Sequence, residues 1–81
     1  METWLEVYTR ETAPTDWAMN QNNLGGALET SGDRVGDKDD WRAAAACFRA
    51  ALEVWTNEHD PVGHDLASRN LTRVLGKLGE P

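Results

Sequence analysis

Apolar residues recur at helical spacing in residues 41–55. Most of them follow one another at intervals of three or four positions: Trp41, Ala44, Ala45, Phe48, Ala51, Leu52 and Trp55. This spacing predicts an amphipathic helix, and the run of four alanines at 43–46 favours helix further. We expect Asp39 or Asp40 to be its N-cap, because an aspartate side chain accepts hydrogen bonds from the free N–H groups of a first turn.

A second helix is predicted over residues 61–78. It opens with Asp60 as a capping side chain and Pro61 at the first helical position, where a missing N–H costs nothing. The residues that we expect it to bury share one stripe: Ala67, Leu71, Val74, Leu75 and Leu78.

The preceding part of the chain repeats this pattern. Pro14 starts a predicted helix, Gly32 stops it, and its apolar stripe consists of Trp17, Leu24, Ala27 and Leu28. Residues 29–40 are acidic, contain two glycines and are predicted to form a loop. We also expect Trp4, Leu5, Val7 and Tyr8 to form the last turns of another helix. An all-α fold of about four antiparallel helices results, with no strand signal.

An internal repeat relates these helices. Shifting the sequence by 47 positions places Leu5-Glu6-Val7 on Leu52-Glu53-Val54, Pro14 on Pro61, and Asn23-Leu24 on Asn70-Leu71. Ten of the 34 overlapping positions are identical. A fixed period of about 20–50 residues is typical of stacked helical units.

These residues resemble the tetratricopeptide repeat (TPR) family. Asn23-Leu24-Gly25, Ala27 and Leu28 match the family's first helix, and the second helix is matched by Ala44, Phe48 and Ala51-Leu52. The period of 47 is longer than the family's, which indicates a lengthened variant whose excess lies in residues 29–40 and 56–60. In the second copy Thr72 replaces the glycine that lets neighbouring helices of the family approach closely.

The resemblance implies one TPR-like domain over residues 1–81 in an unusual frame. Residues 1–11 correspond to a half repeat, 14–58 to a full helix pair and 61–78 to another half repeat. Each helix pair of an array buries its apolar face only against its neighbours, so we expect the half repeats at the two ends to expose apolar surface that can associate with another chain or repeat. Two outcomes stay open: the chain self-associates as a homo-oligomer, or it is part of a longer repeat array.

The resemblance also implies a function as a protein–protein interaction scaffold. The first helices of the family line a concave groove that binds a peptide or partner helix. The corresponding residues here are Met19, Asn22, Asn23, Leu66, Arg69, Asn70 and Arg73, with Gly26, Thr30 and Lys77 beside them. We expect the asparagines to bond a peptide backbone and the arginines to pair with a carboxylate, so that an acidic peptide is one candidate ligand. The alternative is a solvated face carrying an Asp65–Arg69 surface pair.

Composition narrows the remaining possibilities. The 81 residues have a formal net charge of −6, which argues against a nucleic-acid partner. No apolar run is long enough to span a membrane, and a single cysteine, Cys47, fits a cytoplasmic protein in which it is a small buried hydrophobe. His59 and His64 lack metal-ligand spacing and no acid–base pair stands out, so we expect no metal, no cofactor and no enzymatic activity. Self-association through the open ends is the alternative function.

The four tryptophans are either core residues or interface anchors. Trp4, Trp41 and Trp55 lie on apolar stripes and are expected in the core. Trp17, close to a helix start, is the one most available to a partner.

Overall fold

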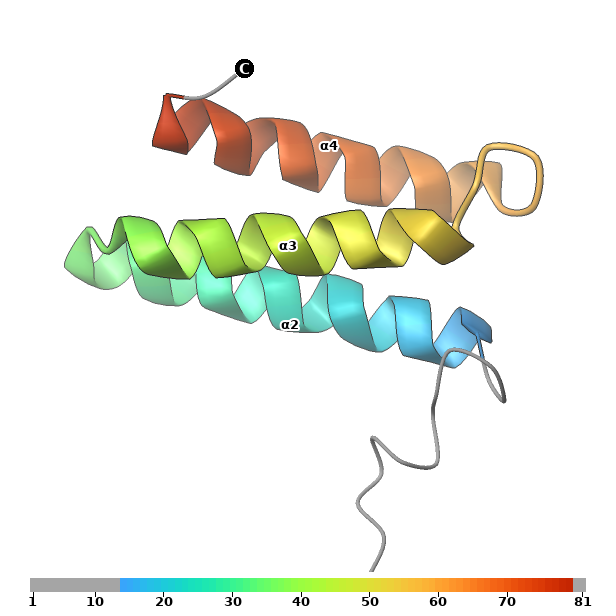
Figure 1. Cartoon of the computed structure of the whole chain (residues 1–81), viewed down its shortest axis with the longest axis horizontal. Helices are drawn as coiled ribbons and strands as arrows, with labels where there is room; N and C mark the ends of the chain where they lie inside the picture. The colour runs from blue at the N-terminus through green and yellow to red at the C-terminus, as the bar shows by residue number, and fades with distance from the viewer. Residues whose placement is uncertain (1–13, 80–81) are drawn as a thin grey trace, which may run out of the picture.

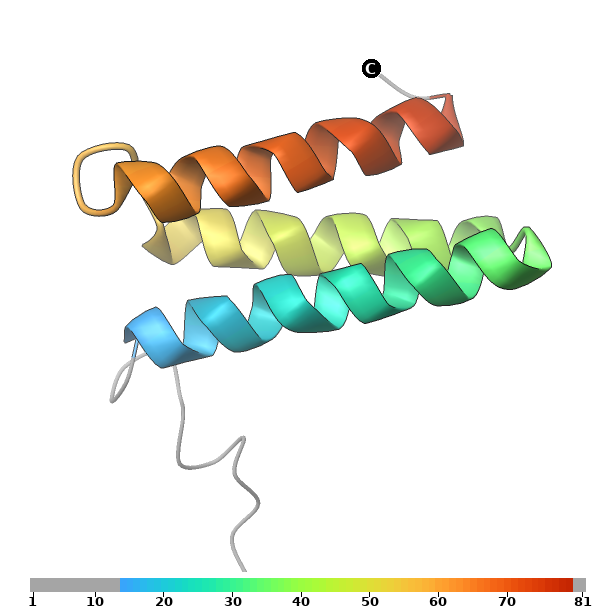
Figure 2. The ribbon, with the colours of Figure 1, turned by 180° about the vertical axis from the view of Figure 1, so that it is seen from behind.

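The computed structural model describes residues 14–79, and within them the regular structure consists of three α-helices. They are α2 (Pro14–Val35), α3 (Lys38–Val54) and α4 (Pro61–Leu78) (Figure 1). Helices α2 and α3 form an antiparallel hairpin, and α4 packs along the other side of α3, parallel to α2 (Figure 2). The all-α fold is confirmed. The helix expected in residues 1–11 lies outside the described residues.

The predicted loop over residues 29–40 is wrong. Helix α2 continues through Gly32 to Val35, and the connection to α3 is reduced to Gly36 and Asp37. Gly36 adopts the left-handed backbone conformation, with φ of 68°, that ends the hairpin's first helix. Gly32 does not end the helix because it has a different role: it is buried, and a Cβ there would lie 2.6 Å from Cδ1 of the Trp41 indole.

The N-cap of α3 is Asp37 instead of Asp39 or Asp40. Its side chain accepts a hydrogen bond from the Asp39 backbone N–H at 2.8 Å. Asp39 and Asp40 therefore lie in the first turn, where their negative charge is favourable to the helix dipole. The helix begins earlier than the apolar pattern indicated because a capping side chain, and not the first apolar residue, marks a helix start.

The hairpin is held together by large side chains on α3 that pack against small residues on α2. Three aromatic residues, two on α3 and one at its C-cap, recur every seven positions: Trp41, Phe48 and Trp55. The phenyl ring of Phe48 rests on Gly25 and the indole of Trp41 on Gly32, while Trp55 shares a core cluster with Ala18. The matching interval of seven on α2 brings each aromatic residue opposite a position with little or no side chain. The helices can thus approach closely without leaving voids.

The buried stripe of α2 consequently differs from the predicted one. It comprises Ala18, Asn22, Gly25, Glu29 and Gly32. Of the residues expected inside, Leu24 is 49% exposed and Ala27 is exposed, whereas Trp17 and Leu28 are partly buried. The prediction was wrong because it looked for large apolar residues, and α2 faces α3 with its smallest ones.

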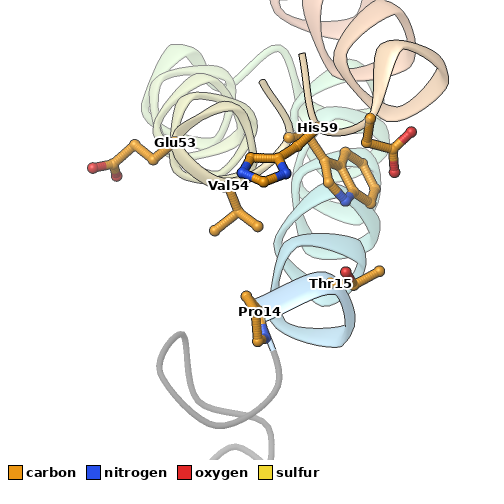
Figure 3. A pocket seen from close by; sticks show the side chains of 7 residues that line it. Pro14, Thr15, Glu53, Val54 and His59 are labelled. Carbon is orange, nitrogen blue, oxygen red and sulfur yellow. The ribbon is translucent and has the colours of Figure 1, made fainter. Parts of the chain in front are cut away.

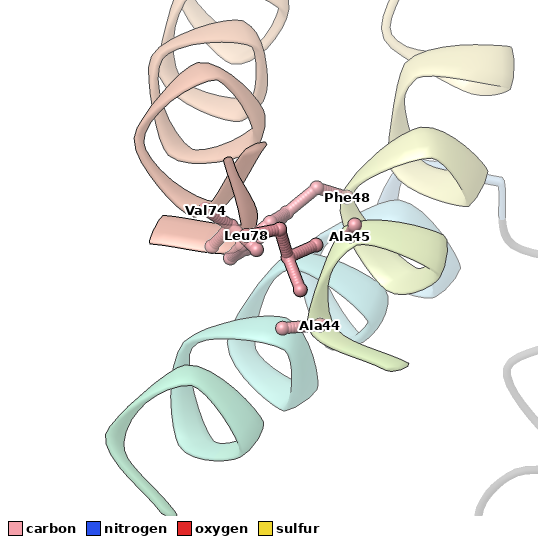
Figure 4. Packing of buried hydrophobic residues seen from close by; sticks show 5 residues of the cluster. All are labelled: Ala44, Ala45, Phe48, Val74 and Leu78. Atoms are coloured by element: carbon pink, nitrogen blue, oxygen red, sulfur yellow. The ribbon is translucent and has the colours of Figure 1, made fainter. Parts of the chain in front are cut away.

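Helix α4 is confirmed as predicted. Asp60 caps it by accepting a hydrogen bond from the Gly63 N–H at 2.8 Å, and Pro61 is at the first position. Gly79 ends it with φ of 72°. Figure 4 shows Val74 and Leu78 meeting the α3 side chains Ala44, Ala45 and Phe48 in the main core cluster. Leu71 and Leu75 are partly buried against the same cluster, and Ala67 is buried in the second one.

The burial of the tryptophan and cysteine side chains can be compared with what the sequence predicted. Trp55 is buried as predicted, and Trp41 is partly buried while its Nε1–H donates to Asp33 Oδ1 at 3.0 Å. Trp4 lies outside the described residues. Cys47 is partly buried, and burial raises the pKa of its thiol, which disfavours the reactive thiolate.

The two adjacent glycines of α2 provide a paired test of this packing. A methyl group on Gly25 would lie 2.5 Å from Cε1 of Phe48, whereas one on Gly26 would meet no atom within 4 Å. We expect Gly25→Ala to lower the free energy of unfolding by about 1–3 kcal/mol through overpacking. Gly26→Ala should raise it by up to about 1 kcal/mol, because alanine is the better helix former.

Urea denaturation followed by circular dichroism measures both effects. The packing described above would be contradicted if the two variants shifted the midpoint in the same direction.

Candidate interaction site on helices α2 and α4

The site residues predicted from the sequence lie on helices α2 and α4, which flank one another on the side of the molecule opposite α3 (Figure 2). We call the surface carried by these residues the α2/α4 face: Met19, Asn22, Asn23, Leu66, Arg69, Asn70 and Arg73. Asn22 is buried and Asn70 partly buried, and the other five are exposed. Met19 and Leu66 are half exposed, and each lies in the second turn of its helix. Because the two helices run parallel (Figure 2), both residues lie toward the same end of the face.

The structure brings the two central asparagines together. Asn70 Nδ2 donates a hydrogen bond to Asn22 Oδ1 at 3.0 Å, and Arg73 Nη2 donates to Asn70 Oδ1 at 3.0 Å. A polar side chain in a mid-helix position is explained here by a partner on the neighbouring helix. We call the residues joined by these bonds, Asn22, Asn70 and Arg73, together with the groups bonded to them, the floor of the face.

The floor includes a buried carboxylate that sequence reasoning missed. Glu29 is 5% exposed, and Arg73 binds it with both Nε and Nη2, each at 2.6 Å. Lys77 Nζ donates to the same carboxylate at 2.7 Å. These two cations, Arg73 above all, outweigh the effect of burial and lower the pKa of Glu29 from 4.5 to about 2.

Glu29 could have been found from the register of the buried stripe. It lies seven residues after Asn22 on α2, and it is separated from Lys77 by 48 positions, as Asn22 is from Asn70. The assignment of residues 29–40 to a loop hid this relationship.

The ion pairs leave the floor of the face without net charge. Lys77 bridges Glu29 and Asp33, whose two oxygens lie 2.9 Å from its Nζ, so two acids face two bases. Raised pKa values for Arg73 and Lys77 have the same cause, hydrogen bonding to these carboxylates. These hydrogen bonds between side chains link α2 to α4.

Arg69 does not join this network. Its Nε lies 3.1 Å from Asp65 Oδ2 one turn away, and both side chains are more than half exposed. The Asp65–Arg69 surface pair that the sequence analysis gave as the alternative is thus present. Exposed ion pairs of this kind contribute little to stability.

Two hydrogen-bond donors of the floor remain available. Within the described residues, Asn22 Nδ2 and Arg73 Nη1 have no acceptor. Asn22 is 9% exposed, and the Arg73 side chain is 50% exposed. Among residues 14–79, the Trp55 indole nitrogen is the side-chain polar atom that is both fully enclosed and unpaired.

A separate cavity of about 390 Å³ lies at the end of the bundle where α2 begins and α3 ends (Figure 3). Val54 and His59 lie above the first turn of α2, which contributes Pro14 and Thr15. The remaining lining residues are Glu53, Trp55 and Asp60, and Asp60 is already engaged in capping α4. The cavity contains none of the site residues predicted from the sequence.

No helix in the described part of the chain is both long and apolar enough to cross a bilayer. Residues 14–79 also contain no group of three or more His, Cys, Asp or Glu side chains placed to hold a metal ion.

Comparison with known proteins adds no relative. No protein family model matches the chain, no curated protein matches it, and no solved structure does. The resemblance to tetratricopeptide repeats therefore remains an interpretation of the residues quoted above.

Proposed function

We propose that this chain is a protein-interaction module of the TPR type and that its α2/α4 face binds a segment of a partner protein. The observation that carries the proposal is that exposed apolar side chains and available hydrogen-bond donors lie beside side chains that are held in place by hydrogen bonds between α2 and α4. Met19 and Leu66 are 50% and 46% exposed, and Asn22 Nδ2 and Arg73 Nη1 are free to donate.

Preorganisation favours this face as a binding surface. The side chains of Asn70, Arg73 and Lys77 are fixed by bonds to α2, so a ligand would not have to order them. An extended segment offers carbonyl groups to the donors and side chains to the apolar end. Asn23, exposed beside the floor, adds an amide that can both donate and accept.

A second candidate function, self-association, is supported by a different surface. The apolar stripe that the sequence analysis expected in the core is partly exposed on α2, with Leu24 at 49% and Ala27 also exposed, and Val35 is 72% exposed. A helix that presents such residues can pack against another helix, either of a second copy or of an adjoining repeat.

Selection from a phage-displayed library of random 12-residue peptides tests the proposed function. We expect peptides whose binding shifts the side-chain amide signals of Asn22, Asn23 and Asn70 in ¹H–¹⁵N spectra. The double variant Met19→Asp/Leu66→Asp should weaken their binding at least tenfold, because charge replaces the apolar anchor site.

Val35→Asp is the matched control, an exposed apolar residue at the other end of α2. Circular dichroism must show that all variants are folded, and light scattering on the same samples reports self-association. Failure to recover any peptide that depends on Met19 and Leu66 would remove the proposal, and a stable dimer abolished by Val35→Asp would favour the second candidate.

A further inference from the structure

We infer that the α2/α4 face selects an uncharged extended segment with an apolar anchor side chain, and not the acidic-ended peptide that its basic residues suggest in the sequence. The inference rests on the proposed function and specifies the chemistry of its ligand. Three features of the face carry it: the prior commitment of its cations, the nature of its remaining donors, and its charge.

The cations are already bound to carboxylates of the same chain. Arg73 uses Nε and Nη2 on Glu29, and Lys77 is shared between Glu29 and Asp33. A ligand carboxylate that captured the Arg73 fork would leave Glu29, 5% exposed, with only Lys77 beside it. A buried charge that loses its principal partner is costly, so the exchange is unfavourable.

The remaining donors suit neutral acceptors. Asn22 Nδ2 is an uncharged amide N–H₂, and Arg73 Nη1 is the one guanidinium nitrogen outside the ion pair with Glu29. A main-chain carbonyl oxygen can accept from either of them without breaking a bond of the floor. Amide side chains and main-chain peptide groups match in both donors and acceptors.

Electrostatics further disfavours an acidic ligand. Glu29 and Asp33 balance Arg73 and Lys77, Asp65 balances Arg69, and the chain as a whole carries a formal charge of −6. An anionic peptide therefore meets long-range repulsion and no net positive site. The apolar end at Met19 and Leu66 supplies the attraction, and such contacts are insensitive to salt.

The test compares matched peptides. One peptide recovered by dependence on Met19 and Leu66 is synthesised in three forms: as selected, with its C-terminus amidated, and with one central residue replaced by Asp. Dissociation constants are measured by calorimetry at 50 and 500 mM NaCl. We expect the selected peptides to be uncharged between their termini, the amidated form to bind equally well, the Asp form at least fivefold more weakly, and salt to change the constants less than about twofold.

Tighter binding of the Asp form, loss of binding on amidation, or more than tenfold weakening in high salt would overturn the inference while leaving the proposed function intact. Absence of any peptide that depends on Met19 and Leu66 would instead remove the proposed function itself. Arg73→Lys provides a check on the donor: it keeps a cation beside Glu29 but loses Nη1, so we expect weaker peptide binding with an unchanged fold. Arg69→Ala, which disturbs only the exposed pair with Asp65, should bind as the parent does.

Discussion

Phe48→Ala is expected to lower the free energy of unfolding by about 3–5 kcal/mol, which is comparable with the whole stability of a domain of this size. The ring is fully buried in the cluster that joins α3 to α4, and it also rests on Gly25 of α2. Its removal takes contacts from all three helices at once. The cavity cannot be filled from α2, because glycine has no side chain to move into it.

Urea denaturation followed by far-ultraviolet circular dichroism measures the loss. Arg49→Ala is the matched control, since Arg49 is the next residue of the same helix and is exposed. We expect the control to change stability by less than about 0.5 kcal/mol. Equal midpoints for the two variants would show that Phe48 is not the central contact of the three helices.

Glu29→Gln is expected to lower the free energy of unfolding by about 1–3 kcal/mol at pH 7. Removing one partner of a buried ion pair costs about 3–5 kcal/mol when the remaining charge stays buried, and the half-exposed Arg73 reduces this by regaining water. Asp33→Asn is the control, because Asp33 is 46% exposed and shares Lys77 with Glu29. We expect it to cost less than about 1 kcal/mol.

The effect of Glu29 should depend on pH in a defined direction. The pKa of Glu29 is 4.5 when its carboxyl group is unperturbed and about 2 in the folded chain, so between these values the unfolded state binds more protons. The stabilisation is complete above about pH 5 and is lost as the pH falls through 4.5 toward 2. Denaturation at pH 7, 5, 4 and 3 should show the gap between parent and variant narrowing on acidification, and a gap that widens would contradict the ion-pair geometry.

The ends of helices were predicted well where a local signal marks them. Asp60 and Pro61 begin α4 as expected, and the helix ends at Leu78 as predicted, because capping depends on a few neighbouring residues and on backbone conformation. The same reasoning failed at Gly32. A glycine inside a helix and a glycine after it have the same sequence signal, and only the Trp41 indole packed against Gly32 distinguishes them.

The candidate site was predicted in part. The repeat shift of 47 placed Asn22 and Asn23 on the face that corresponds to Asn70 and Arg73, and the structure bonds Asn22 to Asn70. It did not indicate that Glu29 would occupy the Arg73 fork. Arg73 binds Glu29 because α2 and α4 lie side by side at the right register. The periodicity of residues within one helix does not predict how far that helix lies from another one.

By itself, the sequence determined that the fold of residues 14–79 is all-α, where α4 begins and ends, and which residues of α3 and α4 enter the core, because helical periodicity and caps are local properties. It did not show that α2 continues to Val35. The tertiary structure alone decided which side of α2 is buried and that Glu29 neutralises Arg73 and Lys77. The physical reason is the same for both. Large aromatic side chains on α3 select small partners on α2, and this close approach sets the register that carries the α2 carboxylates to the cations of α4.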